Sequence, residues 1–204
     1  MSEPAAEDAD PDRAVPEDVP DWEDEYLDRV SDRLMFNFDL ERDVSVGGRR
    51  FDMGGTMRIE NEKHFLHPKL NYGNHETYEY LYARRQDGVT VADLEALVED
   101  AHDVAEARVE RTDDHFSTDV TFVLVVPSIS PDVAEFVETY SGRVLLRYGF
   151  HGHYEINLVV VAPEERSVAH SENADVWRAF RTWEPIEEDE EPGLLGRIAR
   201  RIPI

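Results

Sequence analysis

Histidine and glutamate side chains gather in two segments of the sequence, and this combination can bind a divalent metal ion. Neutral imidazole nitrogens and carboxylate oxygens are common ligands of Zn²⁺ and related ions. The candidate ligands are His64, His67, His75, His151, His153 and Glu155. They form one metal site only if the two segments meet in the folded chain. The alternative is that these histidines are structural, capping strands and bonding to backbone or carboxylate groups.

A second candidate site, for a ligand other than a metal, lies in the first of these segments, which is dense in polar and aromatic residues. Its residues are Lys63, Lys69, Asn71, Tyr72, His75 and Glu76. Both lysines of the chain lie here, whereas the other 19 basic residues are arginines. Retention of lysine in this segment indicates contact with an anionic ligand. Chance, together with packing of the aromatic rings against a sheet, is the alternative explanation.

Well-known catalytic signatures do not match this chain. The His151-Gly152-His153 pair lacks the further histidine and aspartate of metallo-β-lactamase-type hydrolases. A nuclease of the PD-(D/E)XK type needs an acid and a lysine on one strand face, but Glu62 and Lys63 are adjacent and face opposite sides. Walker A, GxGxxG, GxSxG and HExxH motifs are also missing. The sequence predicts no cofactor, and a divalent metal is the alternative.

The composition is strongly acidic, since 46 acids against 21 bases give a formal net charge of −25 at pH 7. In dilute buffer these charges repel one another and loosen a compact fold. Molar salt shortens the Debye length to about 3 Å and removes most of that cost. Together with the scarcity of lysine, the charge predicts a halophilic protein, and it disfavours nucleic acid as a partner. Cysteine is absent, which excludes disulfides, thiolate catalysis and Cys-ligated metal centres.

Two apolar runs are expected to form the core strands that position these side chains. Residues 120–126 and 156–162 are apolar almost throughout, which is typical of strands covered on both faces. Apolar spacing and capping residues predict helices at 21–37, 75–85, 90–109, 130–142 and 173–183.

Further strands are expected around two glycine pairs. Gly47-Gly48 predicts a hairpin turn, and Gly54-Gly55 predicts a bulge or a close backbone approach. Residues 118–150 predict a βαβ unit with parallel strands, after which 154–162 is expected to return antiparallel. The sequence therefore predicts an α/β (α+β) fold, a single domain with a mixed β-sheet packed by helices.

Four segments are expected along the chain. They are a disordered acidic tail (1–20), a single α/β domain (21–185), an acidic linker (186–192) and a basic amphipathic C-terminal peptide (193–204). The first residues lack the features of a secretion signal, and no apolar run approaches the ~18–20 residues of a membrane span, so we expect a cytoplasmic protein.

The C-terminal peptide would present an apolar side as a helix, consisting of Leu194, Leu195, Ile198 and Ile202. It is too short to be stable alone, so we expect it to fold against another surface. That surface is its own domain, an unknown protein partner or, less favoured, a membrane surface.

Three stretches of the chain resemble an uncharacterised haloarchaeal domain family, a domain of unknown function. They are Asp24–Val30, His67–Glu76 and Gly152–Val161. The resemblance covers about residues 21–185 and excludes both ends. Because that family has no assigned activity, the resemblance implies a class of organism and no catalytic residues.

The leading hypothesis is a halophilic, cytoplasmic binding or scaffold module without catalysis. Its binding face would combine residues 67–82 with the turn at 151–155. One alternative is a metal-dependent, hydrolase-like enzyme that uses the His/Glu cluster. The other is a membrane-peripheral protein held by the C-terminal peptide.

Overall fold

The two apolar runs become neighbouring strands at the centre of a mixed sheet. They lie in β4 (His115–Val125) and β6 (His153–Ala162), which pair in parallel with Val120 opposite Ile156. Every residue of β6 is buried, as expected for a strand that is covered on both faces.

The computed structural model describes residues 19–61, 75–109, 115–146 and 152–185. Its helices are α1 (Glu25–Leu34), α2 (Val91–Arg108), α3 (Pro131–Thr139) and α4 (Trp177–Phe180). Its other strands are β1 (Asp39–Val46), β2 (Arg49–Asn61), β3 (His75–Arg85), β5 (Gly142–Leu145) and β7 (Ser167–His170).

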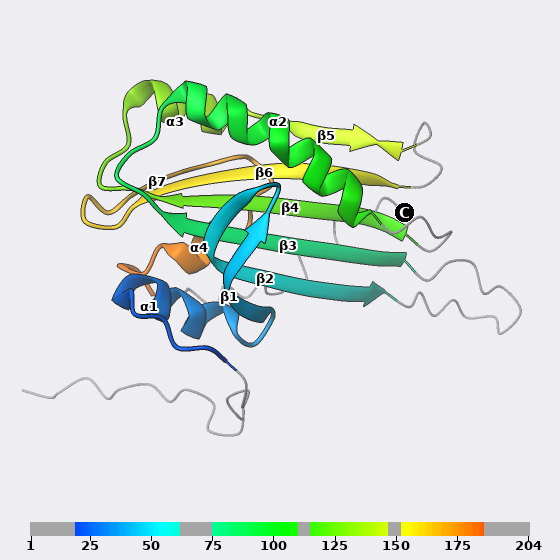
Figure 1. Cartoon of the computed structure of the whole chain (residues 1–204), viewed down its shortest axis with the longest axis horizontal. Helices are drawn as coiled ribbons and strands as arrows, with labels where there is room; N and C mark the ends of the chain where they lie inside the picture. The colour runs from blue at the N-terminus through cyan, green and yellow to red at the C-terminus, as the bar shows by residue number, and fades with distance from the viewer. Residues whose placement is uncertain (1–18, 62–74, 110–114, 147–151, 186–204) are drawn as a thin grey trace, which may run out of the picture.

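The strand order is β1-β2-β3-β4-β6-β5, and β7 pairs with the second half of β6 (Figure 1). Strands β1, β2 and β3 pair antiparallel, whereas β3, β4 and β6 run parallel to one another. The short strands β5 and β7 both run antiparallel to β6. The predicted α+β fold with a mixed sheet packed by helices is confirmed.

Helices cover the two faces of the sheet and divide the core into two layers. One layer joins α2 and α3 to the side of the sheet that carries Phe122 and Ile156. The other joins α1 and α4 to the side that carries Val123 and Val159. Because side chains alternate along a strand, β4 and β6 each supply both layers.

Two local signals of the sequence are confirmed. Gly47 and Gly48 have φ of 57° and 73° and form the two-residue turn between β1 and β2, as a hairpin with positive φ at both positions requires. Thr90 and Asp93 form the capping box that begins α2, in which the Thr90 hydroxyl accepts from the Asp93 N–H.

The second glycine pair, Gly54-Gly55, lies where β2 packs closely against side chains of β1. Strand β2 passes through Gly54 and Gly55 without a break. A Cβ atom on Gly54 would lie 2.9 Å from the Val44 side chain of β1, so only glycine fits there.

The helix predicted at 75–85 is wrong, because this segment is strand β3. Tyr78, Tyr80 and Tyr82 pack into the layer of α2 and α3. Thr77, Glu79 and Leu81 alternate with them and face the other side of the sheet, where Leu81 joins the layer of α1 and α4 and Thr77 lines a cavity. Period-two alternation of aromatic residues is typical of a strand. Strand β3 therefore joins the antiparallel β1–β2 hairpin to the parallel centre of the sheet.

In the parallel crossover predicted within 118–150, the second strand is expected to be the segment that contains β5. The strand that runs parallel to β4 is β6 instead. Strand β5 is antiparallel to β6. The segment 154–162 therefore returns antiparallel to β5 but parallel to β4. Strand β3, helix α2 and β4 form a further parallel crossover. The sequence does not predict it, because residues 75–85 are expected to be helical.

Several predicted features lie outside the described residues. These are most of the acidic tail, the whole linker, the C-terminal peptide with its apolar side chains, and the segments 62–74 and 147–151. Within the described ranges, no helix is long and apolar enough to cross a membrane.

A bulge in β4 and a glycine before β6 bring the start of these two strands into close contact. The pairing of β3 with β4 shifts by one residue, since Glu76 lies opposite His115 but Thr77 lies opposite Ser117. Gly152 has a φ of 73°, and a Cβ atom there would collide with the Phe116 carbonyl oxygen. Gly152 therefore positions the residue that follows it.

Substitution of this glycine should destabilise the protein. We expect Gly152→Ala to lower the free energy of unfolding by about 1–3 kcal/mol or more, because it combines positive φ with a backbone collision. Urea denaturation followed by tryptophan fluorescence measures this change. The matched control is Gly88→Ala, since a Cβ atom on Gly88 meets nothing within 4 Å. Equal stability of the two variants would contradict the packing described for Gly152.

Candidate metal-binding site

The sheet face that carries α1 and α4 changes from apolar to polar along its strands. Near the helices it presents valines such as Val123, Val125, Val159 and Val161. Towards the start of β4 and β6 the same face instead presents polar side chains. These are Thr77, Ser117, Asp119, Thr121, His153, Glu155 and Asn157.

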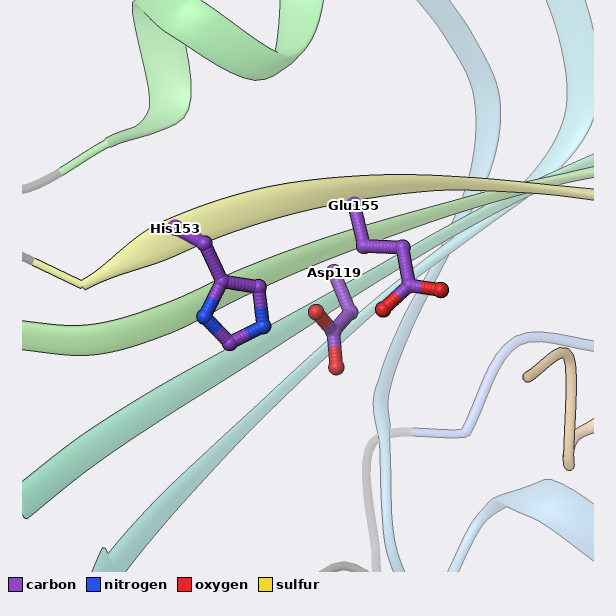
Figure 2. Close-up of side chains that lie close together, drawn as sticks. All are labelled: Asp119, His153 and Glu155. Atoms are coloured by element: carbon purple, nitrogen blue, oxygen red, sulfur yellow. The ribbon is translucent and has the colours of Figure 1, made fainter. Parts of the chain in front are cut away.

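The register of the parallel strands brings three of these polar side chains together. Asp119 of β4 lies directly opposite Glu155 of β6, and His153 is two residues before Glu155 on the same face. Figure 2 shows the three side chains projecting from that face towards a common space. One ligand atom of each lies within 4.8 Å of the other two. His153 and Glu155 are only 8% and 4% exposed.

The His153 ring is held by the bulge in β4. Phe116, the extra residue of the bulge, packs its ring edge-on against the imidazole, with ring centroids 5.7 Å apart and an angle of 80° between planes. Bulges redirect side chains beside functional sites. Regular alternation would turn Phe116 to the face opposite Ser117, whereas both residues line the same cavity.

The chain that follows β7 holds the Glu155 carboxylate in place. The Ser171 hydroxyl accepts from the Leu158 N–H at 2.8 Å and donates to the Leu158 carbonyl at 3.2 Å, which fixes this chain on β6. Two residues later, Asn173 Nδ2 donates to Glu155 Oε1 at 2.5 Å. The sequence suggested Asn173 as the cap of a helix, but its amide orients a buried carboxylate instead.

These side chains surround a cavity of about 210 Å³. Its lining is almost entirely polar and comes from β3, β4, β5, β6 and the chain after β7. The lining residues are Thr77, Phe116, Ser117, Asp119, Arg143, His153, Glu155 and Asn173.

Two of the six metal ligands predicted from the sequence, His153 and Glu155, lie in this cavity. His75 begins β3, where its backbone pairs with Asn61. The other three, His64, His67 and His151, lie outside the described residues. Strand register places Asn61, His75, His115 and His153 at one end of the sheet.

Of the second predicted site, the structure describes the side chain of Glu76. Glu76 lies on the same sheet face as Tyr78, which packs in the α2 layer. There Arg58 Nη2 donates to Glu76 Oε1 at 2.6 Å and the Tyr78 hydroxyl donates to Oε2 at 3.0 Å. The hydrogen bond from Arg58 holds the pKa of the Glu76 carboxyl below its usual range. Lys63, Lys69, Asn71 and Tyr72 lie outside the described residues.

Asp119 is the site residue that sequence reasoning missed. It immediately precedes the apolar run 120–126, so in the sequence it marks only the start of that run. Its spacing does carry a signal, because Asp119 shares a strand face with Thr121 and Val123. An acid on the inner face of a central strand indicates a partner or a ligand.

Comparison with known proteins identifies a family without a known activity. The sequence model of a domain of unknown function (DUF8052) matches residues 23–182, so the chain belongs to this family. No curated protein and no solved structure matches the chain.

The contact between Asn173 and Glu155 should be essential to the site. We expect Asn173→Asp to lower the free energy of unfolding by at least about 1–3 kcal/mol at pH 7, because it replaces a donor to a buried carboxylate with a second negative charge. Addition of Glu155→Gln should recover part of this loss, since it removes one of the two charges. Chemical denaturation of the single and double variants measures both effects. Additive losses would contradict a direct contact.

Proposed function

We propose that this domain is a binding module for a divalent cation, held by Asp119, His153 and Glu155. The observation that carries the proposal is the convergence of an imidazole and two carboxylates, from paired strands, on one enclosed cavity. Small movements of these side chains would bring their ligand atoms to the distances of about 2.0–2.2 Å that such ions require.

The donor set restricts the class of cation. One nitrogen and two carboxylate oxygens suit Mn²⁺, Fe²⁺ or Zn²⁺ better than Cu⁺, which prefers sulfur ligands. Asn173 supports this interpretation, because residues that hydrogen-bond a ligating carboxylate fix its orientation and raise metal affinity.

Asn157 is a further polar group that favours a ligand-binding role for this half of the sheet. It is 3% exposed and follows Glu155 on the same face of β6. In the part of the chain that the structure describes, its Oδ1 has no hydrogen-bond partner. An apolar side chain would avoid this cost, and such local conflicts are typical of functional sites.

Metal binding can be tested directly with Mn²⁺. We expect the full chain in 2 M KCl (a concentration at which surface charges are screened) to bind one Mn²⁺ per molecule, measured by loss of the free-ion electron paramagnetic resonance signal. Because each removes a ligand, Asp119→Asn and Glu155→Gln should weaken binding by more than the about 10–100-fold typical of outer-shell changes.

The matched control for these variants is Glu138→Gln, which removes one negative charge from the exposed surface of α3. It should leave Mn²⁺ affinity unchanged. Equal affinity of wild type and Asp119→Asn would overturn the proposal, as would equal weakening by all three substitutions.

A metal-dependent hydrolase is the second candidate function. It is favoured by the number of protein ligands, because three such ligands leave coordination positions for water and substrate. Mn²⁺-dependent hydrolysis of a chromogenic phosphate ester, lost in Asp119→Asn, would distinguish this enzyme from a module that only binds.

We further propose that the protein works in a saline cytoplasm. The formal charge of −25 on 204 residues supports this proposal. An increase of KCl from about 0.1 M to 2 M should raise the thermal midpoint by more than about 5 °C, because screening removes repulsion worth roughly 1–2 kcal/mol. Circular dichroism measures this shift, and an unchanged midpoint would contradict the adaptation.

A further inference from the structure

We infer that the cavity takes an oxyanion, a phosphate or carboxylate group, between the bound cation and the guanidinium of Arg143. This inference rests on the proposed cation site and names the chemical class of its ligand. The group belongs either to a phosphorylated molecule or to a carboxylic acid, and the test below separates the two.

Arg143 is placed beside the three metal ligands by the sheet. It lies on β5 directly opposite Glu155, so the two residues share a sheet face. Its side chain is exposed yet lines the cavity. Within the described ranges no carboxylate lies within ion-pair distance of its guanidinium, although Glu155 is its cross-strand neighbour.

Charge balance favours an anion once a cation is bound. The carboxylates of Asp119 and Glu155 neutralise the two charges of the ion, and a ligating imidazole is neutral. Among the residues that line the cavity, Arg143 then contributes the one positive charge that the carboxylates do not balance, and a further acid, Glu79, lies opposite Asp119 on β3.

The shape of the guanidinium indicates the kind of anion. Arginine presents a planar fork of N–H donors that matches the paired oxygens of carboxylate and phosphate. Thr77 adds a hydroxyl to the cavity wall, and it accepts from the Ser117 hydroxyl at 3.3 Å. Its own proton is therefore available to an oxygen atom in the cavity.

The cavity volume limits the size of the group. About 210 Å³ corresponds to roughly seven water molecules at about 30 Å³ each. Pockets for whole drug-sized ligands are larger, about 300–1,000 Å³. The cavity therefore fits a cation with one small anion, or with the anionic end of a larger molecule.

Coupling between anion and cation provides the test. Mn²⁺ affinity of the full chain in 2 M KCl is measured alone, with methyl phosphate and with acetate, after correction for Mn²⁺ that each anion binds in solution. We expect one anion to tighten Mn²⁺ binding by about 5–150-fold, the usual range of coupling between sites. Methyl phosphate as the effective probe identifies a phosphate ligand, and acetate identifies a carboxylate.

Arg143→Gln separates this inference from the proposed cation site. The variant should bind Mn²⁺ alone within about twofold of wild type, or more tightly, and should lose the anion effect. The matched control Arg50→Gln removes a charge from the exposed start of β2 at the other edge of the sheet and should keep the effect.

The outcomes distinguish the two proposals. Mn²⁺ binding that neither anion strengthens, or an anion effect that survives in Arg143→Gln, would overturn the oxyanion inference and leave the cation site intact. Absence of Mn²⁺ binding in the wild type would overturn both.

Discussion

The parallel pairing of β4 with β6 is the constraint on which the rest of the structure depends. It sets Val120 opposite Ile156 and, in the same register, Asp119 opposite Glu155. A shift of one residue would turn every side chain of one strand to the other face. The apolar runs fix this register, because both layers of the core use alternate residues of the same two strands. Hydrophobic packing a few residues away therefore sets the positions of the polar side chains in the site.

The polar half of the sheet face is costly to the fold. Buried carboxylates and imidazoles lose hydration and must recover it from partners inside the protein. The structure supplies one such partner from the chain after β7, where the Asn173 amide donates to the Glu155 carboxylate. Apolar residues at the same positions would extend the core beneath α1 and α4. This conflict between stability and polarity is the reason for which we propose a binding role for this region.

Charge acts on this protein at two separate scales. Over the whole surface, an excess of acids governs solubility and salt response, and it says nothing about a particular ligand. The cavity is lined by two acids, Asp119 and Glu155, and by one arginine, Arg143, and burial of Glu155 reduces the screening of its charge by salt. A protein with a strongly negative surface can therefore hold a site that, once a cation is bound, favours an anion.

Sequence patterns predict the local structure correctly where a single local interaction determines it. The Gly47-Gly48 turn, the Thr90–Asp93 cap and the two apolar strands could all be predicted, because each depends on neighbouring residues or on one period of hydrophobicity. Capping residues predict a helix at 75–85, although Tyr78, Tyr80 and Tyr82 recur with the period of a strand. Pairing with β2 and β4 decided that segment, and such pairing is not visible in the segment itself.

The amino-acid sequence by itself determined the acidic composition and the mixed α+β class, and it drew attention to His153 and Glu155 as candidate ligands. Only the tertiary structure decided that Asp119 joins them, that Glu76 faces away, and that Asn173 and Arg143 complete the cavity. The physical reason is that strand register and crossover direction arise from long-range packing. Residues separated by more than 30 positions meet only after β4 and β6 have paired.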